Sequence, residues 1–476
     1  MFQFPAGSNT APLTTAVARP TSSGLTGGGF DPLSLNPILA YEASSSMLAA
    51  GGGAASNLDL VPTFSNRVSG GANAAQSTAS KQPRAHVPVG DGHLYLSGVS
   101  GNYASVPDAD NLDGFGDFAM EFVGSSEDWH DGIAMSLITK YLTGDQSYIF
   151  RLQSNGTIFL LYNSSTTTYV FYSNASHNLV DGEKGGIRVV RSGSSLLFYE
   201  NLYAGSGWQQ IGTTVTGNSA TLNTGTRKVE IGTAENGNSY PFNGSVISSK
   251  VWNSSSPDTA SPVLDIDFST GDHKASSFDC STGQTVTINT SGEDPATIVR
   301  RPFLRFDGVD NFLTGSFNES NTTGGYMFVV YSVNGDGGEE SGRVFVMNSA
   351  GEQGYNNNRS FMWSLRKSND NNIAYYHSYT WRGIHTLGFD PVDGTLLHEV
   401  KAVDGSQFSK VNNGDIQTSS LNLSALSSEE FDIGANPSGS SNPAIDIEAL
   451  YLFDETLTDE DATKVRDYLN AKSSIY

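Results

Sequence analysis

The sequence has almost no cysteine and no long apolar run. Cys280 is its single cysteine in 476 residues, so no disulfide can form within the chain, and stability has to come from packing or self-association. No stretch approaches the ~20 apolar residues that a membrane-spanning helix needs. Residues 1–5 have neither a basic nor an apolar leader segment, so we expect no ordinary secretory signal and no membrane span.

Positive charge is also scarce. The chain has 26 Lys and Arg residues against 49 Asp and Glu residues, which gives a net charge of −23. A field of this sign repels phosphate backbones, so the composition excludes a nucleic-acid-binding protein.

Aromatic residues and glycine are abundant, with 25 Phe, 20 Tyr and 52 Gly. Short runs that alternate apolar with polar residues recur from residue 30 onward, separated by Gly- and Asn-rich turns, and this pattern is typical of antiparallel β-sandwiches. Residues 1–30 lack such runs. We therefore expect them to form a flexible arm, which Phe2 and Phe4 would anchor on a partner.

The β-rich part of the chain looks duplicated. Residues 94–99 (LYLSGV) align with 304–309 (LRFDGV), and residues 229–232 (VEIG) align with 431–434 (FDIG). Two landmarks in the same order, about 200 residues apart, predict a repeat of that length. We expect one sandwich over 31–255, a linker over 256–261 and a second sandwich over 262–476.

A short helix is predicted at the C-terminus. Thr458 is a suitable N-cap, the acidic residues 459–461 favour the positive end of the helix dipole, and residues 462–469 place apolar side chains on one face.

Several of these phrases resemble the concanavalin A-like (laminin-G-like) superfamily, and in particular copies found in bacteriophage virion proteins. Residues 301–313 (RPFLRFDGVDNFL) are similar to an early strand and turn of that family, and 445–469 to its last strand and helix. Residues 30–35 (FDPLSL) and 74–78 (AAQST) are similar to an opening seen in phage proteins, except that Ala74 stands where the family often has His.

The resemblance implies two concanavalin A-like jelly-roll sandwiches in tandem. It also implies a phage virion structural protein on the particle surface, as a head fibre, a capsid decoration or a tail fibre or spike component. A particle assembled in a bacterial cytoplasm and released by lysis would explain the missing leader and disulfides. Other virion proteins are the expected partners, and by analogy with fibres we expect a homo-oligomer, with a trimer favoured.

Catalysis is not predicted. Sugar-cleaving relatives carry two carboxylates in a Glu-x-Asp-x-x-Glu or Glu-x-Asp-x-Glu phrase, and neither phrase occurs. The nearest runs, 265–267 (DID) and 446–448 (DIE), fit strands with alternate residues facing water. A polysaccharide-degrading enzyme and a bacterial surface adhesin remain the alternatives.

Glycan binding needs an aromatic face beside polar groups. The runs 379–382 (YTWR), 127–131 (EDWHD) and 355–359 (YNNNR) fit this chemistry on predicted loops. No cofactor is expected, and calcium at the oxygen-rich loop 108–114 (DADNLDG) is the alternative left open. The candidate residues for binding host surface polysaccharide are Trp381, Tyr379, Arg382, Trp129 and Tyr355.

Overall fold

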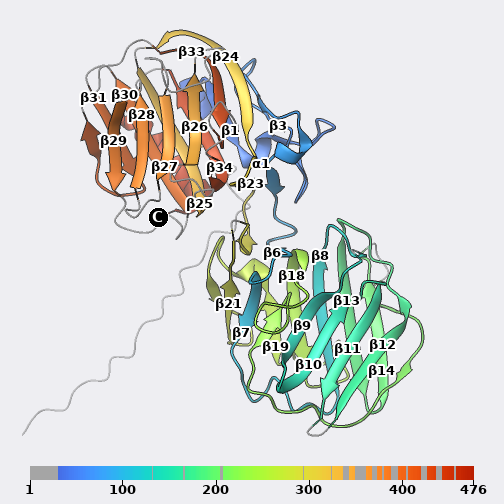
Figure 1. Cartoon of the computed structure of the whole chain (residues 1–476). Coiled ribbons are helices and arrows are strands. Elements are labelled where there is room, and N and C mark those ends of the chain that lie inside the picture. The colour runs from blue at the N-terminus through green and yellow to red at the C-terminus, as the bar shows by residue number, and fades with distance from the viewer. Residues whose placement is uncertain are drawn as a thin grey trace, which may run out of the picture.

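The chain folds into two antiparallel β-sandwiches and one substantial helix, so the predicted fold class is confirmed (Figure 1). The computed structural model describes residues 30–475 except 131, 165–166, 204–206, 293, 323, 336–341, 349–360, 367–371, 378–379, 387–394, 404–405, 420–425, 436–441 and 455–456. The helical elements are η1 (Pro32–Leu35), α1 (Ala43–Ser46), η2 (Ala79–Lys81), η3 (Phe268–Thr270) and α2 (Asp459–Ser473).

The first sandwich consists of sheets 1a and 1b. Sheet 1a has the order β15 (Gln209–Gln210), β14 (Ser195–Asn201), β13 (Lys184–Ser192), β8 (Phe118–Ser125), β18 (Asn243–Trp252), β6 (His93–Ser97), β22 (Thr297–Val299), with β16 (Val215–Thr216) beside β14 and β19 (Leu264–Asp267) beside β18. Sheet 1b has the order β12 (Thr168–Ser176), β11 (Thr157–Asn163), β10 (Asp145–Leu152), β9 (Met135–Leu142), β17 (Val229–Ile231), β7 (Tyr103–Val106), β21 (Thr285–Asn289), β20 (Ser277–Asp279).

The second sandwich consists of sheets 2a and 2b. Sheet 2a has the order β32 (Gln417–Ser419), β31 (Ser406–Val411), β30 (Thr395–Val403), β25 (Gly324–Gly335), β34 (Ala444–Phe453), β23 (Phe303–Asp307), β5 (Arg84–His86), with β1 (Leu39–Glu42) beside β34. Sheet 2b has the order β2 (Met47–Leu48), β3 (Thr63–Phe64), β4 (Ala74–Ala75), β24 (Leu313–Thr322), β33 (Leu426–Ile433), β26 (Gly342–Asn348), β27 (Phe361–Arg366), β28 (Asn372–His377), β29 (Thr380–Thr386).

Alternation along the strands supplies each core. In β8, for example, Phe118, Met120 and Phe122 are fully buried between sheets 1a and 1b, where they meet Tyr148 and Leu160 of sheet 1b. Each such side chain contributes about 1.5–3 kcal/mol relative to an exposed one. The second sandwich has its own, separate core of the same kind.

The two sandwiches have equivalent strand orders. The series β14-β13-β8-β18-β6-β22 in sheet 1a corresponds to β31-β30-β25-β34-β23-β5 in sheet 2a. Likewise β12-β11-β10-β9-β17-β7-β21 in sheet 1b corresponds to β29-β28-β27-β26-β33-β24-β4 in sheet 2b. The chain therefore contains a structural duplication.

Both sequence landmarks mark equivalent close contacts. Gly232 follows β17 and Gly434 follows β33, with φ of +83° and +82°. A Cβ at Gly232 would lie 2.2 Å from Leu96 Cδ1, and a Cβ at Gly434 would lie 2.4 Å from Phe306 Cδ1. Leu96 and Phe306 belong to the other landmark, so the two aligned phrases are in contact in each sandwich, and both glycines are required there.

The leading strands of the two repeats are exchanged. The segment that opens the first repeat, β1 to β5, pairs with β34, β23 and β24 of the second sandwich. The segment that opens the second repeat, β19 to β22, pairs with β18, β6 and β7 of the first sandwich. Figure 1 shows the blue strands β1 and β3 in the same sandwich as the red β34.

The predicted boundaries 31–255 and 262–476 are therefore wrong for the sandwiches, because each repeat's opening strands pair with the other repeat's body. The first sandwich spans 93–299 without interruption, whereas the second combines 39–86 with 303–473. Residues 256–261 are not a linker between sandwiches either. They join β18 to β19, which pair with each other in sheet 1a.

The sandwiches are joined by two antiparallel chain segments. β5 continues into β6, and β22 continues into β23, while β5 pairs with β23 and β6 pairs with β22. His86 lies in the middle of this two-stranded ribbon, stacked on Phe303 at 4.6 Å and edge-on to Tyr95 at 4.5 Å.

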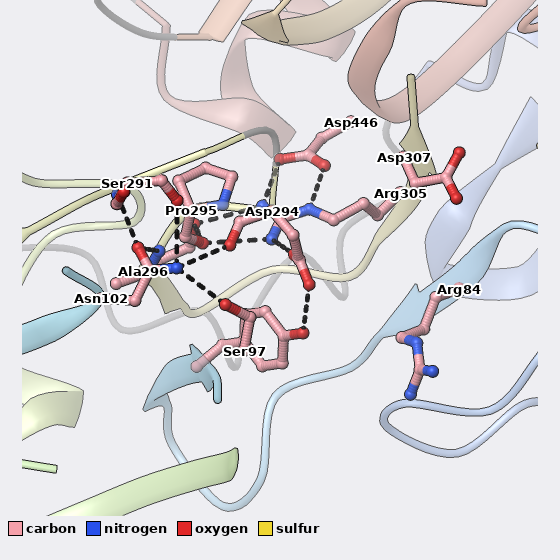
Figure 2. A network of polar contacts seen from close by, with 12 residues as sticks. Arg84, Ser97, Asn102, Ser291, Asp294, Pro295, Ala296, Arg305, Asp307 and Asp446 are labelled. Atoms are coloured by element: carbon pink, nitrogen blue, oxygen red, sulfur yellow. Dashed lines mark hydrogen bonds and ion pairs between the residues drawn. The ribbon is translucent and has the colours of Figure 1, made fainter. Parts of the chain in front are cut away.

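A buried ionic network reinforces the ribbon (Figure 2). The Asp446 carboxylate, on β34 of the second sandwich, accepts from Arg305 Nε at 2.7 Å and Nη2 at 2.9 Å. It also accepts from Lys274 Nζ of the first sandwich at 2.7 Å. Arg305 in turn reaches Asp294 of the first sandwich at 2.7 Å. These contacts fix the two sandwiches against each other.

The neighbouring Glu448 carboxylate makes similar contacts, 3.4 Å from His273 Nε2 and 3.2 Å from Arg301 Nε. Burial opposes ionisation of both carboxyl groups, but the cations Arg305 and Lys274 beside Asp446, and the His273 hydrogen bond together with the Arg301 charge beside Glu448, outweigh it. They hold the pKa of Glu448 at about 2 and the pKa of Asp446 well below its ordinary value.

The exchange predicts which fragments fold alone. Residues 88–301 contain every strand of the first sandwich and should unfold cooperatively on heating. Residues 262–476 lack β1 to β5 and should show no cooperative transition in a circular-dichroism melt, because β34 and β23 lose their edge partners. Cooperative melting of 262–476, together with none of 88–301, would contradict the exchanged pairing.

The ionic network predicts the cost of neutralising its centre. Asp446→Asn leaves Lys274 and Arg305 buried without a full counter-charge, so we expect a loss of about 3–5 kcal/mol in a denaturant titration. The control Asp258→Asn removes a carboxylate whose side chain is 77% exposed, and should cost about 0–1 kcal/mol. Equal effects of the two substitutions would contradict a role for burial at the junction.

Candidate functional site

The outer faces of the equivalent sheets 1a and 2a differ in one important respect. On sheet 2a, helix α2 packs its buried residues Ala462, Val465 and Leu469 over the aromatic side chains of β25 and β34. Thr458 caps this helix by accepting from Asp461 N at 3.1 Å, as predicted. Arg466 adds a 2.7 Å contact to Glu399 of β30. This face of the second sandwich is therefore covered by the chain itself.

On sheet 1a the equivalent face carries no helix in the described part of the chain. A row of polar side chains crosses its strands in register instead. The charges along this row alternate in sign, and the first pair, Lys250 Nζ and Asp265, lies 3.0 Å apart. The row consists of Asp265 (β19), Lys250 (β18), Glu121 (β8), Arg188 (β13) and Tyr199 (β14).

Arg188 is the fixed centre of this row. Its Nε and Nη2 donate to Glu121 Oε2 at 3.0 and 2.6 Å, and its Nη1 donates to Asp258 at 2.8 Å. Arg188 and Glu121 are only 7% and 8% exposed. A guanidinium held by two carboxylates has little freedom to move, so it is a rigid support for whatever lies above it.

Trp208 lies above Arg188. Its indole is 4.3 Å from the guanidinium, a cation–π contact. Gly186 makes room for the ring, because a Cβ at this position would lie 2.8 Å from the indole Cη2. Trp208 remains partly exposed, so the indole is a positioned aromatic surface and not a core residue.

Tyr203 extends the aromatic surface. It is 43% exposed, and Lys184 Nζ lies 4.1 Å from its ring. Burial and the charge of Glu121 raise its pKa to about 12, so the hydroxyl keeps its proton at neutral pH and can donate a hydrogen bond. We call Trp208, Tyr203, Arg188, Glu121 and Asp258 the Trp208 platform.

The predicted glycan-binding residues do not come together. Trp129 is 1% exposed in the first core, edge-on to Phe242, with Nε1 donating to Glu183 O at 3.3 Å. Its indole cannot meet a sugar, so this prediction is wrong. Trp381 and Arg382 belong to strand β29 and not to a loop as predicted. Tyr379, Tyr355, Phe2 and Phe4 lie outside the described residues.

The predicted calcium loop already holds a cation of the protein. Lys140 has a fully buried side chain, and its Nζ lies 2.5 Å from Asp108, 2.8 Å from Asp113 and 2.6 Å from Gly225 O. The ammonium thus uses all three of its donors on oxygens that calcium would need. Within the described residues, no group of three or more His, Cys, Asp or Glu side chains is placed to hold a metal ion.

The two carboxylate runs have structural roles. Asp446 and Glu448 are buried in the junction and bound to cations. Asp265 pairs with Lys250, and Asp267 caps η3 by accepting from Ser269 N at 2.9 Å. Neither run provides a free acid and base facing a common cleft, as glycoside hydrolysis requires. None of the described helices is long and apolar enough to cross a membrane.

Comparisons with known proteins gave distant structural matches only. No protein-family model and no curated protein matches the sequence. Similar solved structures include the LG1-3 region of the laminin alpha2 chain, at 12% identity and a TM-score of 0.29, covering 77% of this chain and 63% of that one. Domains LG4-5 of the mouse laminin alpha1 chain match at 10% identity and 0.28, covering 76% of this chain and 88% of that one.

The carbohydrate recognition domain of Emp46p matches at 9% identity and a TM-score of 0.25, covering 33% of this chain and 83% of that domain. The chain spans less than two thirds of the laminin alpha2 region. Likeness at this level concerns the fold and carries no information about a ligand.

Proposed function

We propose that this chain is a non-catalytic, glycan-binding structural protein. The observation that carries the proposal is the Trp208 platform, a rigidly supported aromatic face on a sheet that no described helix covers, whereas its duplicate is covered by α2. A sugar ring offers C–H groups on its faces and hydroxyls at its edge. The indole can pack against the C–H face of the sugar, and the polar side chains around it can form hydrogen bonds with the hydroxyls.

The charges of the platform favour a neutral sugar. The charge of Arg188 is already balanced by the carboxylates of Glu121 and Asp258, so it attracts a further anionic group only weakly. The 77% exposed Asp258 carboxylate can accept from sugar hydroxyls, and the Tyr203 hydroxyl can donate. A negatively charged ligand would be repelled by both carboxylates.

We also propose that the protein is exposed on a bacteriophage particle, as a head fibre, decoration or tail fibre component that attaches through the arm containing Phe2 and Phe4. This part of the proposal is supported by the resemblance of residues 30–35 and 74–78 to an opening seen in phage proteins, beside the family phrases at 301–313 and 445–469. Trp381, Tyr379, Arg382 and Tyr355 remain candidates for a second glycan contact on the other sandwich.

The proposal predicts a separation of binding from stability at Trp208. Because one face of the indole is supported by Gly186 and Arg188 and the ring is partly exposed, Trp208→Ala should weaken binding to a neutral host polysaccharide about tenfold. The melting temperature should fall by less than about 4 °C. Binding is measured by calorimetry on the full chain, and stability by a thermal melt.

Trp381→Ala is the companion variant, since Trp381 is the candidate glycan contact proposed for the second sandwich. Weakened binding in Trp381→Ala but not in Trp208→Ala would move the site to the second sandwich. Unchanged binding in both variants, or no binding of any neutral glycan by the wild type, would contradict the proposed function.

Self-association is the remaining part of the proposal. Without disulfides, and with edge strands such as β12, β29 and β32 unpaired along the described sheets, the chain gains by burying these edges against further copies. Light scattering at micromolar concentration should show about three times the 50.6 kDa mass of one chain. A single 50.6 kDa species would rule out the trimer.

A further inference from the structure

A second aromatic row crosses the outer face of sheet 1b, on the opposite side of the first sandwich from the Trp208 platform. Arg151 on β10 is the direct partner of Phe159 on β11, and Phe159 is the direct partner of Tyr172 on β12. The alternate residues of these strands, such as Phe150 and Leu160, point into the core. The three side chains therefore form one line across an outward-facing surface.

Arg151 is held between two aromatic rings. Its guanidinium carbon lies 4.1 Å from the centre of the Phe159 ring and 4.3 Å from that of Tyr240, in the loop between β17 and β18. Tyr172 packs edge-on against Phe159 at 5.3 Å. Contacts with two rings hold the guanidinium in place, and its N–H donors lie along its edge.

Part of that edge is unused. With the Gln153 amide oriented so that its oxygen faces Arg151, that oxygen can accept from Nε at 2.9 Å and from Nη2 at 3.1 Å. A guanidinium has five N–H donors, so three have no partner among the described residues. Tyr240 borders the guanidinium and is 45% exposed, and Tyr172, beyond Phe159 in the same row, is 50% exposed.

The missing carboxylate is the informative feature. Arg188 and Arg305, like several other arginines of this acidic chain, are bound to Asp or Glu. In the described part of the chain, Arg151 has no ion-pair partner, although the chain has 49 acidic residues. An oriented guanidinium without an ion-pair partner, beside the exposed ring of Tyr240, is complementary to a planar anion attached to a ring.

We propose that Arg151, Tyr240 and Tyr172 form a binding site for an acidic sugar, whose carboxylate receives two parallel hydrogen bonds from the Arg151 edge while its ring lies against a tyrosine. Gln153 fixes the orientation of the guanidinium. The site extends the proposed glycan-binding function to a second ligand class, and it shares no residue with the Trp208 platform.

Calorimetry on the full chain tests the proposal with two acidic ligands, hexagalacturonate and sialyllactose, each beside a matched neutral ligand. The methyl ester of hexagalacturonate and lactose are the neutral partners. We expect at least one acid to bind about tenfold or more tightly than its neutral partner. Arg151→Gln should abolish that preference.

Arg151→Lys is the second variant, because it keeps the positive charge but loses the planar fork of the guanidinium. It should also bind the acid about tenfold more weakly. Trp208→Ala is the reciprocal control and should leave acid binding unchanged.

The proposal is overturned if neither acid binds, if acid and neutral partner bind equally, or if Arg151→Gln binds the acid like the wild type. A change in oligomeric mass in Arg151→Gln, seen by light scattering, would instead make this face a contact between copies of the chain. Failure of the Trp208 platform is recognised separately, because it shows in the binding of neutral glycans alone.

Discussion

The contact between Asp446 and the two cations Arg305 and Lys274 is the constraint on which the arrangement of this molecule depends. It lies where two chain segments cross between sandwiches, and it joins residues that are about 140 and 170 positions apart in the sequence. Burying three charges is costly unless each is paired. A junction built in this way tolerates one relative placement of the sandwiches, since any displacement would separate charges without admitting enough water to solvate them.

Duplication has given the two sandwiches the same strand order and different surfaces. The second sandwich uses the outer face of sheet 2a to dock α2, with Tyr326, Phe328 and Tyr451 beneath the helix. In the first sandwich, the outward-facing residue of β8 that pairs with β13 and β18 is Glu121. The equivalent residue of β25 in the second sandwich is Phe328. The outer face of sheet 2a is thus buried beneath α2, whereas the outer face of sheet 1a retains exposed aromatic and charged groups.

Much of the fold could be predicted from the sequence, because alternation within a strand and a cap before a helix are local properties. The repeat was visible for a similar reason, since Gly232 and Gly434 are required by equivalent contacts. The exchange of leading strands is not a local property. β5 pairs with β23 and β22 pairs with the equivalent strand β6, and no short sequence pattern predicts which of the two partners each strand takes. Burial of Trp129 depends on Phe242, over a hundred residues away, and exposure of Trp208 depends on the glycine beneath it. Polar neighbours in the sequence could not distinguish these two tryptophans.

The exchanged topology has a mechanical meaning. Phe30 contacts Tyr468 of α2, so both ends of the described chain are attached to the second sandwich, and tension applied between them bypasses the first. The first sandwich is a side branch, loaded only by what its own surfaces hold. Force applied to the first sandwich is carried by two chain segments, β5 to β6 and β22 to β23. These segments run side by side, and side-chain ion pairs reinforce the junction between the sandwiches. Two paired strands resist separation under force better than a single flexible linker. If the first sandwich is bound to a surface that pulls on it, its position relative to the second sandwich should be retained.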